Sequence, residues 1–366
     1  MKIPFHMRRR TFLQSAAGVA LASPLGAASQ PNIRLGIDAY SIRSLGWKAA
    51  QILDYAKALK VDAVMLSSPD AFDRLEPAQL TKLRDDAANV GILIETAIGS
   101  ICPTSSAYGQ KTGDPAEFTL RQLRLAKAVG AKVMRCFLGG PADRRGPQPF
   151  EVHMVAMVNV LRSVRSQAID LGVKIAIENH GDFQARELRT VIEQAGKDWV
   201  GVCLDNGNAL TVVEDPMLTI EVLGPYAFTA HVRDSVVYEH PRGAAMQYVA
   251  LGDGTQDLRA YVARFRELCP NAAFQLEVIT GRTPTILPFL EPEFWKAFPN
   301  ANAAEFARFV ALAKKGRPFE GKMVIAEGGN MPPEFQAAMK AQQRYDLERS
   351  LTYAAKVLGI GIRTRA

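Results

Sequence analysis

Four ionisable side chains between residues 178 and 277 stand directly after short apolar runs: Glu178, Asp205, His231 and Glu277. A carboxylate at the buried end of a strand is costly unless it is paired, and carboxylates gathered together raise one another's pKa. A divalent cation relieves both penalties, and three oxygen ligands with one imidazole suit Mn, Co, Mg or Zn. Any one of these residues alone could be an ordinary strand-end cap. Together, on consecutive strands, they predict a site for one divalent metal ion.

Three polar neighbours are candidates for substrate binding. His180 follows Glu178 by two residues and so points to the same side of the strand. We interpret it as a hydrogen-bonding group for the substrate or a partner of the metal ligands, with a satisfied structural histidine as the alternative. Arg233 stands two residues past His231 and could hold a hydroxyl, carboxylate or phosphate, with Asp234 as its ion-pair partner. Asn208 is a candidate to orient the substrate.

The elements that must position these side chains alternate along the chain. Eight short runs are rich in Val, Ile and Leu, as expected of strands that are buried on both faces, and helical patterns lie between them. Eight strand–helix units predict a closed (β/α)8 barrel, an α/β fold whose active site lies at the carboxyl ends of the strands. The expected strands span residues 33–41, 61–68, 92–101, 132–138, 173–180, 200–206, 227–234 and 273–279.

Helix signals agree with this order. Asp114-Pro115 and Asp215-Pro216 each place an acidic N-cap before a proline at the first helical position. A final amphipathic helix is expected over residues 345–358. An open, doubly wound sheet is the alternative fold, but the first turn after a strand, residues 40–44, lacks the glycine-rich loop that such sheets use for phosphate.

One long segment interrupts the rhythm. Residues 280–344 separate the eighth strand from the last helix, and a structureless loop of that length is unusual. We expect a short helix over residues 303–315 within it. The whole insertion would act as a lid or an oligomer arm, or would be a plain surface insertion. Residues 31–366 are otherwise expected to form a single barrel domain.

The first 28 residues are typical of a twin-arginine signal peptide. Arg8-Arg9-Arg10 is followed closely by Phe12-Leu13 and an Ala-rich apolar stretch over residues 16–25. The stretch is too short for a good membrane span, so we expect a periplasmic protein without stable membrane insertion. These residues carry four of the positive charges behind the net charge of +7 and no acid, so the remainder is near balance. That balance gives no reason to expect a nucleic-acid partner.

The cysteines predict no structural zinc site, because none of them forms a CxxC pair. We expect four buried thiols, although one disulfide would be compatible with an oxidising compartment. The four are Cys102, Cys136, Cys203 and Cys269.

The strand ends together resemble the xylose-isomerase-like barrel superfamily. The fragments that carry the resemblance are residues 177–180, 204–208, 231–234 and 276–277, with the glycine turn at 251–254. The resemblance implies a sugar or cyclitol isomerase or epimerase, in which a metal binds adjacent sugar oxygens and stabilises an enediolate. It implies that Glu178 and Glu277 are both metal ligands and acid/base groups. One removes a proton beside the carbonyl, and the other returns one on the opposite face.

Departures from the family keep other functions open. Strand two, residues 64–68, lacks the glutamate of many members, while Asn208 and Val237 stand where ketose 3-epimerases tend to have histidine and arginine. The main alternative is a lyase, dehydratase or hydratase acting on a 3-keto-glycoside or inosose at the same site. An apurinic endonuclease would need more than the four histidines after the signal, and a non-catalytic periplasmic sugar-binding protein would need a decayed metal position. The substrate, metal identity and oligomeric state, a homo-oligomer included, stay open.

Overall fold

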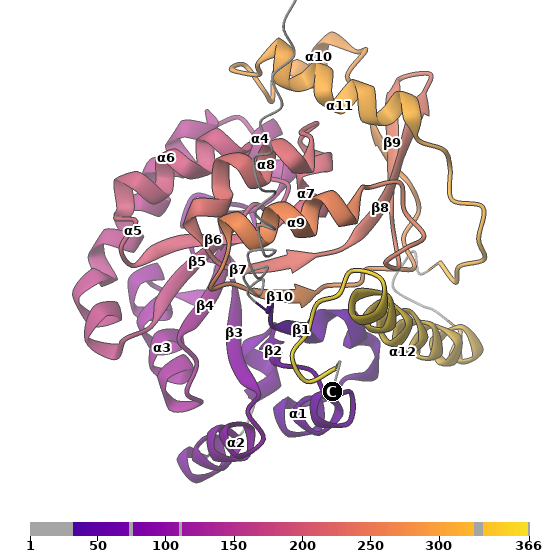
Figure 1. Cartoon of the computed structure of the whole chain (residues 1–366). Coiled ribbons are helices and arrows are strands. Elements are labelled where there is room, and N and C mark those ends of the chain that lie inside the picture. Colours follow the sequence, from indigo (N-terminus) through magenta and orange to yellow (C-terminus); the bar gives the residue numbers. More distant parts are fainter. Residues whose placement is uncertain (1–31, 73–75, 110–111, 326–331, 365–366) are drawn as a thin grey trace, which may run out of the picture. The chain divides into compact units, whose positions relative to one another are not determined.

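A computed structural model of the chain describes residues 32–72, 76–109, 112–325 and 332–364. Residues 32–366 form one compact unit. The predicted signal at residues 1–28 lies outside the described residues. Eight parallel strands close into a barrel in the order β1-β10-β7-β6-β5-β4-β3-β2, with helices around it (Figure 1). This arrangement confirms the (β/α)8 fold.

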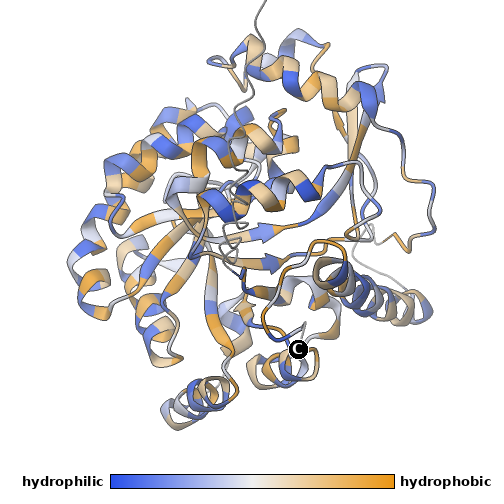
Figure 2. Cartoon of the chain, in the orientation of Figure 1, coloured by the Kyte–Doolittle hydropathy of each residue, from blue (hydrophilic) through white to orange (hydrophobic). Residues whose placement is uncertain are grey.

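All eight strands expected from the apolar runs are present. Most of their residues are buried, and the barrel ribbons are largely hydrophobic in Figure 2. Strand β10 is the eighth strand of the sequence prediction, and it closes the barrel by pairing with β1. The barrel strands are β1 (Leu35–Asp38), β2 (Ala63–Leu66), β3 (Leu93–Ser100), β4 (Val133–Phe137), β5 (Lys174–Glu178), β6 (Val200–Asp205), β7 (Ala227–Val232) and β10 (Ala273–Leu276).

The long outer helices follow the strands, and two of them begin at the predicted caps. The Asp114 carboxylate accepts a hydrogen bond from the backbone of Glu117, and Asp215 does the same for Met217, at the starts of two of these helices. The helices are α1 (Ala49–Ala58), α2 (Pro77–Asn89), α3 (Pro115–Ala128), α5 (Phe150–Leu171), α6 (Ala185–Ala195), α8 (Pro216–Leu223), α9 (Leu258–Leu268) and α12 (Pro333–Lys356).

Short helices occupy several loops at the strand ends. A 3-10 helix, η1 (Ala39–Leu45), follows β1 directly, and another, η2 (Pro69–Phe72), follows β2. Helix α4 (Pro141–Arg145) follows β4, and α7 (Asn206–Thr211) begins at the residue after β6. A single 3-10 turn, η4 (Gly224–Tyr226), leads into β7. Two of these loops, η1 and α7, carry residues of the site described below.

A second sheet stands beside the barrel and was not predicted. Strands β8 (Asp234–His240) and β9 (Gly243–Val249) form an antiparallel hairpin, and β11 (Thr285–Leu287) pairs with β9. Helices α10 (Pro292–Trp295) and α11 (Ala303–Lys315) share with this sheet a separate apolar cluster that includes Met246, Leu287 and Phe309. The same cluster contains Leu210 of α7 at the end of β6. The hairpin and insertion therefore form a cap on the carboxyl side of the barrel.

The expected start of the last helix was wrong. Helix α12 begins at Pro333 rather than at residue 345. Its first nine residues are exposed except Met339, so they show no amphipathic pattern, and Ala, Gln and Lys extend the helix through their intrinsic propensity. The predicted insertion 280–344 therefore ends inside α12. The helix expected over 303–315 matches α11.

Two further expectations concern cysteines and membranes. All four cysteines are free and buried, as the sequence led us to expect. Among the described residues, no helix has both the length and the apolar character needed to cross a membrane.

Candidate active site

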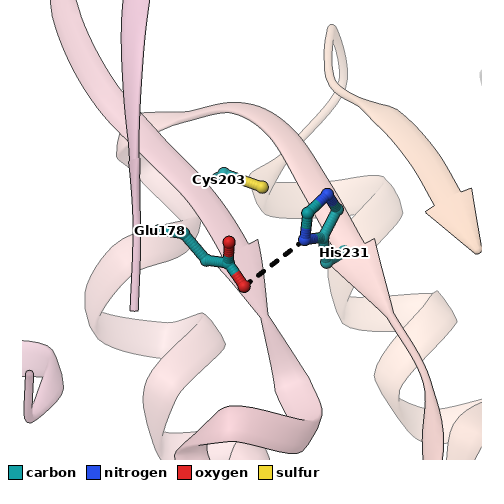
Figure 3. Close-up of side chains that lie close together, drawn as sticks. All are labelled: Glu178, Cys203 and His231. Atoms are coloured by element: carbon teal, nitrogen blue, oxygen red, sulfur yellow. Dashed lines mark ion pairs between the residues drawn. The ribbon is translucent and has the colours of Figure 1, made fainter. Parts of the chain in front are cut away.

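Four strand ends bring their ionisable side chains to one point. One ligand atom each from Glu178, Asp205, His231 and Glu277 can be chosen so that all four atoms lie within 4.8 Å of one another. All four side chains are buried. Nδ1 of His231 lies 3.4 Å from Oε1 of Glu178 and 3.5 Å from Oε2 of Glu277, and Figure 3 shows the glutamate pointing toward the imidazole. We call these residues the four-ligand cluster.

Asparagines fix the relative heights of the strand ends. Asn179, directly after Glu178, donates to the carbonyl of Asp205 at 2.7 Å and accepts from its backbone N–H at 2.9 Å. Asn206, directly after Asp205, makes the same pair of bonds to the backbone of Arg233 at 2.8 and 2.9 Å. Each acid is thus followed by an amide that ties its strand to the next one. The Glu-Asn and Asp-Asn pairs were noted in the sequence, but this bridging role was missed.

Asn208 is used by the protein itself. Its amide Nδ2 lies 3.0 Å from Oε1 of Glu178 and 3.0 Å from Oδ2 of Asp205. Its amide oxygen accepts a hydrogen bond of 2.9 Å from the Tyr248 hydroxyl, which comes from β9. Asn208 was expected to orient the substrate. In this arrangement it holds two carboxylates of the cluster and links them to the cap.

Asp38, at the end of β1, supports His231 from below the cluster. Its Oδ2 lies 2.9 Å from Nε2 of His231, while its Oδ1 accepts a 2.6 Å hydrogen bond from the backbone of Tyr40 and contacts the Ser67 hydroxyl. A carboxylate on the outer nitrogen of an imidazole orients the ring and raises its basicity as a ligand. Asp38 was missed from the sequence, although it is an ionisable residue inside an expected strand.

Two guanidinium groups neutralise the carboxylates. Arg233 contacts the carboxylates of both Asp205 and Glu277, and its guanidinium lies 4.9 Å from the centre of the Tyr248 ring. Arg135, inside β4, forms an ion pair with Glu178. The sequence made Arg233 a candidate for substrate binding, and here its guanidinium contacts the four-ligand cluster. Arg135 was missed, because it stands in the middle of an apolar run rather than at its end.

The pKa values reflect this balance of burial and charge. Burial alone would raise the pKa of Glu178, but Arg135 and His231 outweigh it and hold that pKa well below its ordinary value. Burial raises the pKa of Asp205 to about 6 despite the nearby Arg233. Burial by itself lowers the pKa of His231, whereas Cys203, Glu178 and Asp38 raise it well above its ordinary value. Without a metal ion, cationic side chains supply the positive charge that the cluster needs.

The donor set fits a divalent cation. Nδ1 of His231 is buried, faces two carboxylates and has no hydrogen-bond partner in the part of the chain that the structure describes. An orphaned imidazole nitrogen that faces carboxylates is a metal-ligand arrangement, because a buried polar atom otherwise finds a hydrogen bond. Three oxygen donors and one nitrogen donor suit Mn, Co, Mg or Zn. Arg233 must share or leave the carboxylates when such an ion binds.

A thiol offers a second combination that the chemistry disfavours. Cys203 of β6 lies beside Glu178 and His231, with an atom of each within 4.8 Å of the others (Figure 3). Burial raises the pKa of Cys203 to about 11. This combination supplies three ligand atoms, whereas the four-ligand cluster supplies four, three of them the carboxylate oxygens that Mg and Mn prefer. The four-ligand cluster is therefore the better candidate.

Two neighbouring residues lie apart from the cluster. His180 stacks on Phe137 with 4.2 Å between ring centres, and its Nδ1 lies 3.0 Å from the carbonyl oxygen of Gly139. The expected pairing of Asp234 with Arg233 was wrong. Asp234 instead accepts hydrogen bonds from the backbone of Gly252 and Gly254, at 2.9 and 3.0 Å. The carboxylate is used to hold the glycine turn after the hairpin.

Comparison with known proteins agrees with this geometry. A family model described as "Xylose isomerase-like TIM barrel" matches residues 53–297, which is more than half of the chain. The chain belongs to the xylose isomerase-like TIM barrel family. This match confirms the resemblance to xylose-isomerase-like barrels that the strand ends suggested.

Individual relatives are distant. The 3-oxo-isoapionate decarboxylase of Pectobacterium atrosepticum is 23% identical over 203 residues, which are 55% of this chain and 66% of the relative. The match thus spans slightly less than two thirds of that enzyme's length. A structure of D-psicose 3-epimerase in the presence of D-fructose has a TM-score of 0.59 at 17% identity, covering 89% of this chain and all of the epimerase. The IOLI protein with a bound zinc atom has a TM-score of 0.53 at 16% identity, covering 77% and 96%. At these identities the structural likeness establishes the fold alone.

Proposed function

We propose that the protein is a divalent-metal-dependent enzyme that moves a proton beside the carbonyl of a sugar or cyclitol, as an isomerase or epimerase. The observation that carries the proposal is the convergence of Glu178, Asp205, His231 and Glu277 within 4.8 Å. A metal ion there would polarise a carbonyl oxygen and stabilise negative charge. The structures of D-psicose 3-epimerase and of the zinc-containing IOLI protein, which share the fold, support this choice.

The chain's own residues have separate roles in this proposal. Glu178 and Glu277 come from β5 and from the end of β10, which are not neighbours in the barrel. Two carboxylates on opposite sides of a bound substrate can remove a proton from one face and return it on the other. Asp205 and His231 complete the ligand set. Asn208, Asp38 and the two asparagine bridges position these groups.

A lyase is the second candidate. The relative from Pectobacterium is a decarboxylase by name, and it acts on a 3-oxo acid. Loss of a carboxyl group or a β-leaving group next to a carbonyl needs the same stabilisation of negative charge that proton abstraction needs. Asn208, which stands where ketose 3-epimerases tend to have histidine, donates to two carboxylates of the cluster here. This departure also disfavours a plain ketose 3-epimerase.

We also propose that the cap acts as a lid over the site. The Tyr248 hydroxyl of β9 reaches Asn208, and α7 shares the apolar cluster of α11. A cover that touches the residues around the reacting groups excludes water from them.

Export to the periplasm by the twin-arginine route remains the proposal for residues 1–28. Replacing Arg9 and Arg10, the pair that precedes Thr11-Phe12-Leu13, by lysine and fractionating cells would test it: retention of the variant in the cytoplasm supports export by this route.

The function is tested by exchange of solvent deuterium into a panel of ketoses, inososes and 3-keto-sugars, with and without added metal. Label at a carbon beside the carbonyl, dependent on metal, supports the proposal. Release of carbon dioxide or of a β-leaving group favours the lyase over the isomerase. Exchange at the wild-type rate in both Glu178→Gln and Glu277→Gln would rule out the acid/base roles assigned to these two residues.

A further inference from the structure

A basic cavity lies between the loop after β1, the segment after β10 and helix α12. Its volume is about 380 Å³, which suits part of a small ligand. Three cationic side chains line it, Arg43 of η1, Arg282 after β10 and Lys340 of α12. No described residue that lines the cavity is acidic. A cavity with this charge attracts an anion.

Tyr40 holds the two arginines in place. The Arg43 guanidinium stacks 4.5 Å from the centre of the Tyr40 ring and donates to the Tyr40 carbonyl oxygen at 3.1 Å. Arg282 donates to the Tyr40 hydroxyl at 3.2 Å, and its own carbonyl oxygen accepts a 2.9 Å bond from Gln247 of the cap. Both guanidinium groups are thus fixed by neutral partners, and neither pairs with a carboxylate among the described residues.

A buried amide in the same wall lacks an acceptor. Gln343 of α12 is 1% exposed and lines the cavity. Its oxygen accepts a 2.9 Å hydrogen bond from the backbone of Ser44, but its Nε2 has no partner among the described residues. An unsatisfied buried N–H donor is uncommon in proteins and usually marks a missing ligand or water. The amide nitrogen itself is closed off from water-sized groups, so the arginines and Lys340, not this amide, are the groups that a ligand in the cavity reaches.

The cavity is tied to the reacting groups. Arg43 follows Asp38, the last residue of β1, by five residues, and Arg282 follows Glu277, at the end of β10, by five residues. Strands β1 and β10 are neighbours in the barrel. The Ser41 hydroxyl donates to the carbonyl of Leu276 at 3.1 Å and accepts from the backbone of Val278 at 3.0 Å. The first loop is therefore fastened on both sides of Glu277. Burial lowers the pKa of Arg43 most, and the positive charges of Arg282 and Arg233 lower it further.

We infer that Arg43 and Arg282 bind a carboxylate of the substrate, so that the enzyme acts on a keto sugar acid rather than on a neutral sugar. This inference rests on the proposed function, because it treats the four-ligand cluster as the place where the carbonyl binds. A guanidinium group matches the planar geometry of a carboxylate and forms charge-assisted hydrogen bonds to it. A phosphate shares the charge, and the test separates the two.

Three ligands that differ in one group make the test. D-fructose, D-fructuronate and D-fructose 6-phosphate share a ketone and its neighbouring stereocentres, and carry a hydroxyl, a carboxylate or a phosphate at C6. Binding to the full chain with Mn²⁺ is measured by calorimetry for wild type, Arg43→Gln, Arg282→Gln and the double variant. Arg186→Gln is the matched control, since this exposed arginine pairs with Glu305 far from the cavity. Circular dichroism and bound Mn²⁺ verify that each variant is folded and loaded.

The expected result is that wild type prefers fructuronate to fructose by about tenfold or more, the size of a charge-assisted hydrogen bond. The preference should fall to within about threefold in the double variant and persist in Arg186→Gln. An unchanged preference in the double variant, or equal affinity of wild type for fructose and fructuronate, overturns the carboxylate site while leaving the metal-dependent function standing. A preference for the phosphate overturns the carboxylate assignment. Failure of all three ligands to bind with Mn²⁺ overturns the carboxylate site, whereas the proposed function is decided separately by the panel of deuterium-exchange substrates.

Discussion

Oδ2 of Asp38 lies 2.9 Å from Nε2 of His231, across the imidazole ring from the nitrogen that faces Glu178 and Glu277. The carboxylate is completely buried, and its other oxygen is held by the Tyr40 backbone. The histidine ring is therefore fixed with Nδ1 toward the carboxylates. Such a partner sets which nitrogen of the imidazole is left to bind a metal.

Replacing Asp38 by asparagine should weaken divalent metal binding by about 10- to 100-fold, the usual effect of removing a partner of a ligating histidine. Asparagine keeps the shape but removes the negative charge that supports His231. Calorimetric titration with Mn²⁺ measures the effect, and Asp54→Asn, an exposed aspartate paired with Lys57, is the control. Equal affinity for Mn²⁺ in Asp38→Asn and wild type would show that Asp38 does not support a ligand.

Replacing Arg233 by methionine should make the protein more dependent on metal for its stability. Arg233 neutralises Asp205 and Glu277, and removing one partner of a buried ion pair costs about 3–5 kcal/mol. A divalent ion can replace that charge, so the rise in melting temperature on adding Mn²⁺ should be larger in Arg233→Met than in wild type. Turnover should fall in the same variant.

The control for this variant is Arg186→Met. Its exposed pair with Glu305 should contribute at most about 1 kcal/mol, and its response to Mn²⁺ should match wild type. A Mn²⁺-induced shift in Arg233→Met no larger than that of wild type would mean that the guanidinium and the metal do not occupy overlapping positions.

The sequence predicts the barrel well because its strands are continuous apolar runs. The hairpin after β7 was missed because β7 and β8 are separated by a single residue, Arg233, with no glycine or proline to mark the break. Pro241-Arg242-Gly243 marks the turn of the hairpin and was the available signal. Helix α12 could not be placed in full, since its exposed first half lacks the periodic apolar face on which the prediction depended.

The site was predictable where a strand end carries the ionisable residue. Glu178, Asp205, His231 and Glu277 are of this kind, and the structure brings them together. Asp38 reaches His231 only because β1 closes the barrel against β10, a contact between residues 193 positions apart. Pairings of that kind depend on how the barrel closes. Listing every ionisable residue inside an expected strand would have found both Asp38 and Arg135.

Glu277→Gln should bind metal less tightly and should lose deuterium exchange by about 10²- to 10⁴-fold, the contribution typical of a positioned acid/base group. Because the residue is also a candidate ligand, exchange must be measured at saturating Mn²⁺. The control variant is Glu291→Gln, since that glutamate is exposed and pairs with Arg242. Exchange at the wild-type rate in metal-saturated Glu277→Gln would remove the residue from the proton-transfer step.

Glu95 of β3 is buried in the barrel interior, near enough to His231 and Asp38 for their charges to act on its pKa. Its Oε2 accepts hydrogen bonds of 2.6 Å from Thr229 and 2.8 Å from Gln275. Burial raises its pKa to about 7, above the ordinary 4.5 that applies in the unfolded chain. Between these values the folded state binds more protons than the unfolded state. The free energy of unfolding therefore falls as pH rises from about 4.5 to 7, and stays lowered above that range.

Replacing Glu95 by glutamine should remove this loss of stability, because the neutral amide oxygen can accept the same two hydrogen bonds. The difference between variant and wild type should grow from pH 5 to pH 8 and reach about 3 kcal/mol at most, the equivalent of the pKa change. Denaturant unfolding at both pH values measures it, with the exposed Glu117→Gln as control. A variant less stable than wild type at pH 8 would mean that the Glu95 carboxylate is held charged by its neighbours.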